Sequence, residues 1–203
     1  MLELDHLAIA AETLGEGCEW LHDAIGARAG PGGQHAHFGT HNRLLGLSGG
    51  LYLEVIAIDP EAAKLAHARW FDLDRFSGPP RLHNWICRTR DLEAAQQALP
   101  GMGPQVALVR GELNWRMAVP EDGQLPFDDC HPAVIQWDCD AHPAALLPDH
   151  GISLRRLIVT HPEAQELEAR LEGHLSDRRV VFETGQAGLR AEFDTPGGCR
   201  FLG

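Results

Sequence analysis

Short apolar runs and helix-like segments follow one another in a repeating order along the chain. Residues 4–11 form an apolar run of strand length, and Thr13 and Glu16 then form a capping box that opens a helical segment. After a glycine-rich stop come a strand-like run at 35–47, interrupted by glycine, and another at 51–59. The pattern predicts elements in the order β-α-β-β-β.

The same order restarts after a polar segment. Residues 61–70 predict a linking helix, residues 82–89 then have the character of a strand, and Asp91 is the N-cap of a second helix. Three more strand candidates follow, at residues 106–109, 113–119 and 133–139. A third start at residues 152–160 precedes another helix and short strands. The sequence therefore predicts two copies of one unit and part of a third.

The length of 203 residues lies between the usual sizes of one domain and of two. We predict a single domain built from a first module at 1–60, a second module at 81–143 and a partial third module at 151–203. A linking helix and loop at 61–80 join the first two modules.

Superposing the two complete units on their strand-to-helix junctions gives a register between them. His6 then stands opposite Asn84, and the fourth strands place Glu54 opposite Gln136. A duplicated unit of this kind curls its strands around a ligand-sized concavity, where polar groups on apolar strands define what binds. These four residues are the first candidates for a site.

Charge and cysteine content narrow the choice of partners. With 17 Lys and Arg against 29 Asp and Glu, the net charge of −12 repels polyanions, so we expect neither nucleic acid nor membrane as a partner. No apolar window has the length of a membrane helix and no signal peptide is recognisable, which predicts a soluble, cytoplasmic protein. Five scattered cysteines without a CxxC pair argue against a disulfide framework and a zinc ribbon.

Polar side chains on apolar strands are the strongest chemical signal. His6 and Glu54 need a partner, a metal ion or an aqueous cavity, because an unpaired charge in an apolar environment is costly. The alternative is that the two residues bond each other or the backbone within the core.

Two other groups are weaker candidates. His35 and His37 are two residues apart and face the same way on a strand, so they form either a ligand pair or part of a solvated face. Arg116 lies among apolar strand residues, where it either offers a guanidinium to a carboxylate or enolate oxygen or forms a salt bridge at the rim.

Several stretches of sequence together carry a family resemblance. They are LDHLAIA with His6, GGQHAHFGTHN at 32–42, YLEVIAID with Glu54, ELNWRMAVP around Trp115, and LPF, VIQW and HP within 125–143. In this order and spacing they resemble the vicinal oxygen chelate (VOC) superfamily, and more closely its glyoxalase-like branch of bacterial proteins.

The resemblance implies an α+β fold in which paired βαβββ modules form a cupped, partly open mixed sheet with helices outside. It also implies a divalent metal ion, such as Zn, Ni, Fe, Mn or Mg, held by His and Glu from the first and fourth strands of each module. His6 and Glu54 are then the ligands of the first module, whereas the neutral amides of the second module are poorer ligands. The expected substrate-binding residues are His35, His37, Asn42, Asn84, Arg116 and Gln136.

The implied function is a metal-assisted lyase, isomerase or ring-opening, dioxygenase-like enzyme acting on a small oxygenated metabolite. Glu54 or a nearby histidine moves a proton, and the cation stabilises charge that grows on an enolate oxygen. The main alternative is a metal-free protein that sequesters a small molecule, as bleomycin-resistance proteins do. A homodimer is expected, unless the third module caps the sheet within one chain.

Overall fold

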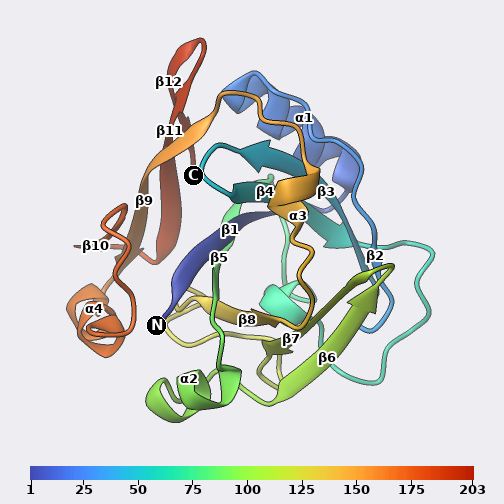
Figure 1. The fold of residues 1–203 in the computed structure, drawn as a ribbon. Coiled ribbons are helices and arrows are strands. Elements are labelled where there is room, and N and C mark those ends of the chain that lie inside the picture. Colours follow the sequence, from blue (N-terminus) through green and yellow to red (C-terminus); the bar gives the residue numbers. More distant parts are fainter.

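A curled eight-stranded mixed sheet forms the centre of the computed structural model, which describes residues 1–203 (Figure 1). The first module contributes β1 (Glu3–Ala10), α1 (Leu14–Ile25), β2 (Gln34–His35), β3 (Thr40–Leu47) and β4 (Leu51–Ile58). The second module contributes β5 (Arg81–Arg88), α2 (Leu92–Ala98), β6 (Gln105–Arg110), β7 (Leu113–Ala118) and β8 (Ala133–Trp137). The predicted α+β fold of paired βαβββ modules is confirmed.

The two modules join at the middle of the sheet, whose strand order is β2-β3-β4-β1-β5-β8-β7-β6. β1 runs parallel to β4 and β5 parallel to β8, whereas β1 and β5 pair antiparallel. The sheet curls until its two edge strands, β2 and β6, come close together (Figure 1). The two modules thereby surround one shared interior.

The helices begin where the sequence predicts, because their caps satisfy free backbone N–H groups. The Thr13 hydroxyl accepts a hydrogen bond from the Glu16 N–H, and the Asp91 carboxylate accepts one from the Ala94 N–H. α1 ends at Gly26, whose φ of 78° is left-handed and suits glycine. No helix of the protein combines the length and the apolar character needed to span a membrane.

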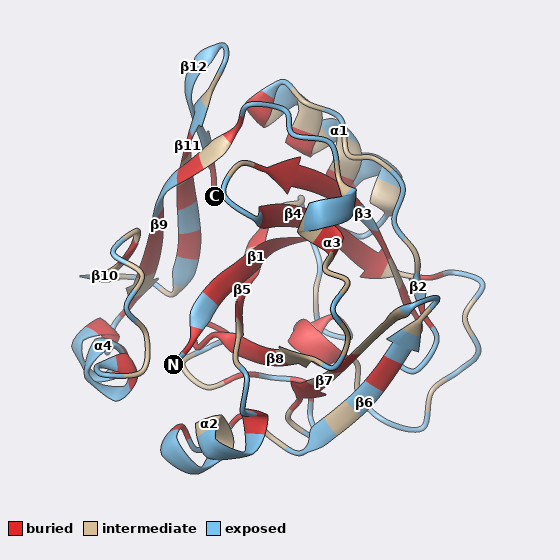
Figure 2. Cartoon of the chain, in the orientation of Figure 1, coloured by how far each residue is buried: buried red, intermediate tan, exposed pale blue.

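The central strands β1, β4 and β5 bury both of their faces (Figure 2). The outer face, carrying Leu7, Ile9 and Trp85, packs against α1 and a second sheet. The inner face carries smaller apolar residues such as Ala8 and Ile86 and surrounds the interior. Strands buried on both sides explain why the apolar runs of the sequence are almost continuous.

Two β-bulges set which side chains of the central strands face inward. In the β1–β5 pairing Asp5 is the extra residue on β1, and His83 is the extra residue on β5. Each bulge shifts by one residue the alternation of side chains between the two faces of the strand. Leu4 and Leu7 therefore both belong to the outer core although they are three residues apart. The side chains of Asp5 and His6 can therefore turn to the same side.

The remaining chain forms a separate four-stranded sheet in the order β10-β9-β11-β12. Its elements, with the short helix that precedes them, are α3 (Pro143–Leu146), β9 (Ser153–His161), α4 (Ala164–Leu171), β10 (Val180–Thr184), β11 (Gly188–Thr195) and β12 (Gly198–Leu202). In this third unit the first strand, β9, pairs parallel with the second strand, β10. In each of the two modules the first strand instead pairs parallel with the fourth strand. The third unit thus repeats the order of elements without the pairing, and it covers the outer face of the central sheet.

The linking segment between the modules lacks the expected helix over residues 61–70 and has only a short 3-10 helix, η1 (Trp70–Asp72). The Asp59 carboxylate accepts a hydrogen bond from the Glu61 N–H, and Asp74 binds both the backbone and the guanidinium of Arg69, so local bonds compete with helical ones. Stacking of Trp70 on Phe38, with ring centroids 4.4 Å apart, fixes the end of the segment in the core. Tertiary packing outweighs the helix propensity of its alanines.

Candidate functional site

The interior of the curled sheet holds a small cavity with a volume of about 30 Å³. Aromatic rings form most of its apolar wall: Tyr52, Trp70, Phe71, Trp115 and Trp137. Its polar lining consists of His6, His35, Asn42, Glu54 and Arg110. The cavity is large enough for about two water molecules or for the reactive end of a small ligand.

Asp5, His6 and Glu54 form a line of side chains at this cavity. His6 donates from Nδ1 to Asp5 Oδ1 over 2.7 Å, and its Nε2 lies 3.5 Å from Glu54 Oε2. The His6 ring stacks on Tyr52, with centroids 4.3 Å apart. The imidazole is therefore fixed in position and directs Nε2 toward the carboxylate of Glu54.

The charges of this line support one another. Burial opposes the charged form of His6, but hydrogen bonds with Asp5 and Glu54 outweigh it and raise the pKa of His6 to about 9. Burial likewise opposes ionisation of Glu54, and the bond with His6 outweighs it and lowers the pKa of Glu54 to about 2. The pKa of Asp5 is also lowered, because hydrogen bonds from His142 and His6 overcome its burial. A positive charge between two carboxylates is the favoured state.

Asn42 connects Glu54 to a second group of polar side chains. Its amide nitrogen donates to Glu54 Oε1 over 2.5 Å, and its oxygen accepts from Arg110 Nη1 over 3.3 Å. Arg110 Nη1 also donates to His35 Nε2 over 3.1 Å. Because arginine can only donate, His35 Nε2 is the acceptor and Nδ1 carries the proton, which it donates to Thr40 over 3.0 Å. Burial lowers the pKa of His35 to about 4, so this imidazole is neutral.

A segment after β8 lies over the cavity and is tied to it by His142. We call residues 139–151 the arm; it contains α3 and connects β8 with β9 (Figure 1). His142 Nε2 donates to Asp5 Oδ2 over 2.9 Å, and Trp137 Nε1 donates to the same oxygen over 3.1 Å. Asp5, which is fully buried, thus joins the arm, β8 and His6.

Four of the eight predicted site residues lie together at the cavity, namely His6, His35, Asn42 and Glu54. His37 is instead exposed, and its ring stacks on His67 with centroids 4.6 Å apart. Arg116 faces outward and binds Asp138 through two hydrogen bonds of 2.8 and 2.9 Å, which is the rim salt bridge that the sequence left open.

Gln136 also faces away from the cavity, because the register predicted for the fourth strands differs from the observed one. On β8 the inner face carries Ala133 and Ile135, whereas the Gln136 side chain accepts a hydrogen bond from the Leu92 N–H at the start of α2. Glu54 pairs with Ala8 and, in the matching place of the second module, Ala133 pairs with Ile86. Ala133 thus occupies the position that corresponds to Glu54.

Asn84 occupies the position that corresponds to His6. The β1–β5 register pairs His6 with Ile86 and Ala8 with Asn84, which is the symmetric arrangement that the superposed sequences predict. Asn84 is 1% exposed, does not line the cavity, and neither atom of its amide has a hydrogen-bond partner. The second module therefore places neutral groups where the first module has charges.

Sequence reasoning did not find Asp5, Tyr52, Arg110 or His142. The sequence does contain a signal for Asp5. The outer-face residues Leu2 and Leu4 have even numbers, whereas Leu7 and Ile9, on the same face, have odd numbers. Side chains on one face of a regular strand are two residues apart, so the strand must contain a bulge between Leu4 and Leu7. His142 carries no such signal, because its contact with Asp5 joins residues that are far apart in the sequence.

The donor set at His6 and Glu54 fits two positions around a divalent cation. Two donors about 2.1 Å from one tetrahedral ion lie about 3.4 Å apart, close to the 3.5 Å between His6 Nε2 and Glu54 Oε2. A carboxylate on the far nitrogen of the imidazole, as Asp5 provides, is the usual partner of a metal-binding histidine. No group of three or more His, Cys, Asp and Glu side chains is arranged to hold a metal ion. Further ligands of such an ion would be water or substrate.

Comparisons with known proteins agree with this fold. A crystal structure of a hypothetical protein from Staphylococcus aureus has a TM-score of 0.59 at 16% identity, covering 92% of this chain and 87% of that one. Methylmalonyl-CoA epimerase from Mycobacterium tuberculosis has a TM-score of 0.43 at 22% identity, covering 66% and 85%. At 16% identity the Staphylococcus aureus structure is similar in fold alone. No curated protein matches the sequence. The family model described as glyoxalase-like domain matches residues 4–175, so the chain belongs to the glyoxalase-like domain family.

Proposed function

We propose that this protein is an enzyme that moves a proton on a small oxygenated metabolite with the help of a divalent cation held by His6 and Glu54. The observation that carries the proposal is the line Asp5–His6–Glu54, in which Nε2 and Oε2 face each other over 3.5 Å at the cavity. When bound, the cation supplies positive charge that stabilises negative charge growing on a substrate oxygen. Isomerisation, lyase chemistry and ring opening all pass through such a charge.

The chain's own residues prepare the site for this chemistry. Asp5 fixes the orientation of His6 through Nδ1, and Asn42 fixes Glu54 through Oε1, so neither side chain has to reorganise. Glu54 is the one carboxylate that lines the cavity, which makes it the candidate to accept or return the proton. The aromatic wall limits access of water and strengthens electrostatic interactions inside.

A second candidate function is metal-free binding of a small molecule. It is favoured by the second module, where Asn84 and Ala133 occupy the positions of a ligand pair and offer no strong metal donor. The proton that His6 holds between Asp5 and Glu54 can take the place of a cation in this case. Metal content separates the two functions.

The test is elemental analysis of the purified protein after dialysis against a divalent metal salt. The parent is expected to retain about one ion per chain, and the His6→Ala and Glu54→Gln variants are expected to lose it. His37→Ala is the matched control, because His37 is exposed and outside the cavity, and it should bind metal like the parent. Circular dichroism of each variant verifies that the fold is intact.

Two results would contradict the metal-assisted function. One is a parent protein that retains no ion, which would leave metal-free binding as the function. The other is equal loss of metal in His37→Ala and His6→Ala, which would place the ion elsewhere on the surface.

A further inference from the structure

A second hollow opens outside the cavity and shares two of its lining residues, Leu44 and Arg110. We call it the outer groove; its volume is about 450 Å³, against about 30 Å³ for the inner cavity. Its walls come from residues 28–32, from β3, from the turn between β6 and β7, and from the arm. The groove and the cavity are therefore neighbours, with Leu44 and Arg110 between them.

The arm that forms one wall of the outer groove is fixed at both ends. His142 binds Asp5 at one end, and at the other the Ser48 hydroxyl donates to Asp149 Oδ1 over 2.9 Å. Between them the arm crosses β3 at Gly46, where a Cβ atom would lie within 2.9 Å of the Leu147 side chain. Glycine at this position allows the close approach, so the groove is a defined feature of the fold.

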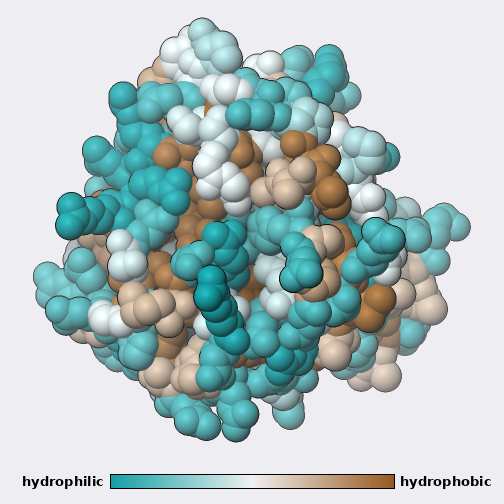
Figure 3. All heavy atoms as spheres, viewed as in Figure 1, coloured by the Kyte–Doolittle hydropathy of each residue, from teal (hydrophilic) through white to brown (hydrophobic).

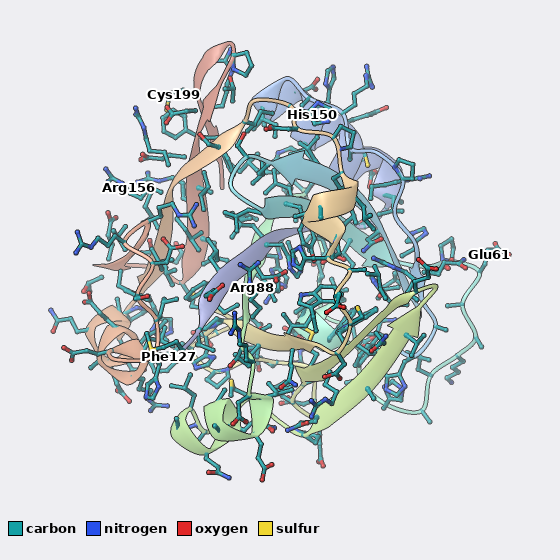
Figure 4. All side chains as sticks on the ribbon, viewed as in Figure 1. Glu61, Arg88, Phe127, His150, Arg156 and Cys199 are labelled. Atoms are coloured by element: carbon teal, nitrogen blue, oxygen red, sulfur yellow. The ribbon has the colours of Figure 1, made fainter.

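The charge of the outer groove is opposite to that of the protein. No Asp or Glu lines it, although the chain has 29 of them and a net charge of −12. Two arginines, Arg28 and Arg110, line it together with His150, which lies on the exposed part of the arm (Figure 4). Arg110 forms no ion pair, since its partners are the amide of Asn42 and the neutral imidazole of His35. Its positive charge is free to meet an anion.

The outer part of the groove is apolar. Leu113, Leu146 and Leu147 line it together with three prolines, and apolar surface is visible over the arm (Figure 3). Leu146 is 71% exposed and adds to this apolar surface. The guanidinium of Arg110 beside the cavity and the apolar side chains along the groove suit a ligand that has both an anionic and an apolar part.

We infer that the outer groove binds the apolar chain of an aliphatic carboxylic acid, whose carboxylate lies against Arg110 where the groove meets the cavity. A planar guanidinium matches a carboxylate with two parallel hydrogen bonds. The carboxylate is then the part of the ligand nearest the cavity that contains Glu54, and the chain is directed away from it along the groove. This inference rests on the proposed function only for what happens in the cavity, because binding in the groove requires no metal.

The experiment is a calorimetric titration with hexanoate, hexanol, acetate and hexyl phosphate, each with and without EDTA. Hexanoate is expected to bind at least about tenfold more tightly than either hexanol or acetate, since each lacks one half of the recognised pattern. EDTA should leave the preference for hexanoate unchanged, because binding in the groove requires no metal ion. The experiment therefore distinguishes a failure of the groove assignment from a failure of the metal proposal. Equal binding of hexanol and hexanoate, or tighter binding of hexyl phosphate, would overturn the assignment.

Two pairs of variants test the position of the ligand. Arg110→Gln is expected to weaken the binding of hexanoate about tenfold or more and to leave the binding of hexanol unchanged. Arg190→Gln is the control, because Arg190 is an exposed arginine of β11 that does not line the groove, and it should have no effect. Leu146→Glu places a carboxylate in the groove and should weaken hexanoate about fivefold or more. Val109→Glu is its control, because Val109 is 76% exposed and does not line the groove. If Val109→Glu weakens hexanoate as much as Leu146→Glu, the groove is not the binding site.

Discussion

The two modules of the central sheet share a backbone and differ in charge. Each carries a bulge on its first strand, at Asp5 in the first module and at His83 in the second. The next residue is His6 in the first module and Asn84 in the second. The first module is charged at this point, and the second carries a neutral imidazole and an amide there.

The difference shows that the bulge and the charges are separable. In the first module Asp5 accepts three hydrogen bonds from side chains and keeps its charge. In the second module His83 donates to the backbone carbonyl of Phe71, and burial lowers the pKa of His83 to about 4, so it stays neutral. The strand geometry persists without the ionic network, which means that the network of the first module is not needed to form the sheet.

The largest effect is expected when the charge at the first bulge is removed. Asp5→Asn keeps the acceptor for His6 Nδ1 but loses the negative charge, so affinity for Zn²⁺ should fall about 10-fold to 100-fold. His83→Asn makes the matched change in the second module and should stay within about twofold of the parent. Competition with a chromophoric chelator measures both affinities, and equal losses in the two variants would refute the assigned role of Asp5.

A smaller effect is expected from the two asparagines. Asn84→Leu replaces a buried amide without partners by an apolar group of similar size, which should raise the free energy of unfolding by about 1 kcal/mol. Asn42→Leu removes the donor to Glu54 and the acceptor for the Gly33 N–H, and should lower the free energy of unfolding by about 2 kcal/mol. Urea denaturation of both variants measures the sign of each change in the free energy of unfolding. A destabilised Asn84→Leu protein would show that the amide of Asn84 has a hydrogen-bond partner.

The smallest effect concerns the dependence of stability on pH, because burial and hydrogen bonding shift the pKa of one carboxylate in each module in opposite directions. Burial raises the pKa of Asp129 in the second module from 3.8 to about 6, whereas the pKa of Glu54 in the first module is lowered. Because folded Asp129 holds its proton more tightly than unfolded Asp129, its contribution to stability is present below about pH 4 and is lost as the pH rises to about 6.

Asp129→Asn should remove this loss, since the amide oxygen can still accept from the Leu125 N–H. Above pH 6 the variant is expected to be more stable than the parent by about 1 kcal/mol, and near pH 4 the two should be equal. Thermal unfolding at a series of pH values measures the difference. A constant difference at every pH would mean that the ionisation of Asp129 is not its cause.

The sequence predicts the strands of the modules, and it predicts that His6 and Asn84 occupy equivalent positions, because these strands are long apolar runs with clear boundaries. It places Glu54 and His6 on strands that the structure brings together. It does not fix the register of β8: the position that corresponds to Glu54 is Ala133, not Gln136, and a shift by an odd number of residues moves Gln136 to the opposite face. For the same reason Arg116 points outward while its neighbours Trp115 and Met117 point inward.

The polar residues of the site that sequence reasoning missed depend on contacts between distant parts of the chain. Arg110 is the last residue of an edge strand and resembles a solvated end, yet the curl of the sheet brings it to His35 of the opposite edge. The left-handed backbone of Phe71, with φ of 58°, directs another part of the linking segment to the cavity. Neither local propensity nor periodicity carries information about sheet closure.

The cover that the third unit forms over the outer face has a consequence for the order in which the protein matures during synthesis. Leu7 and Trp85 leave the ribosome long before Phe193, the residue of β11 that shares their core. Until then the outer face of the paired modules is an open apolar surface on a nascent chain, of the kind that chaperones recognise and that aggregates. The synthesis of β11 and β12 therefore completes the core behind a sheet whose inner face carries His6 and Glu54, two residues made much earlier.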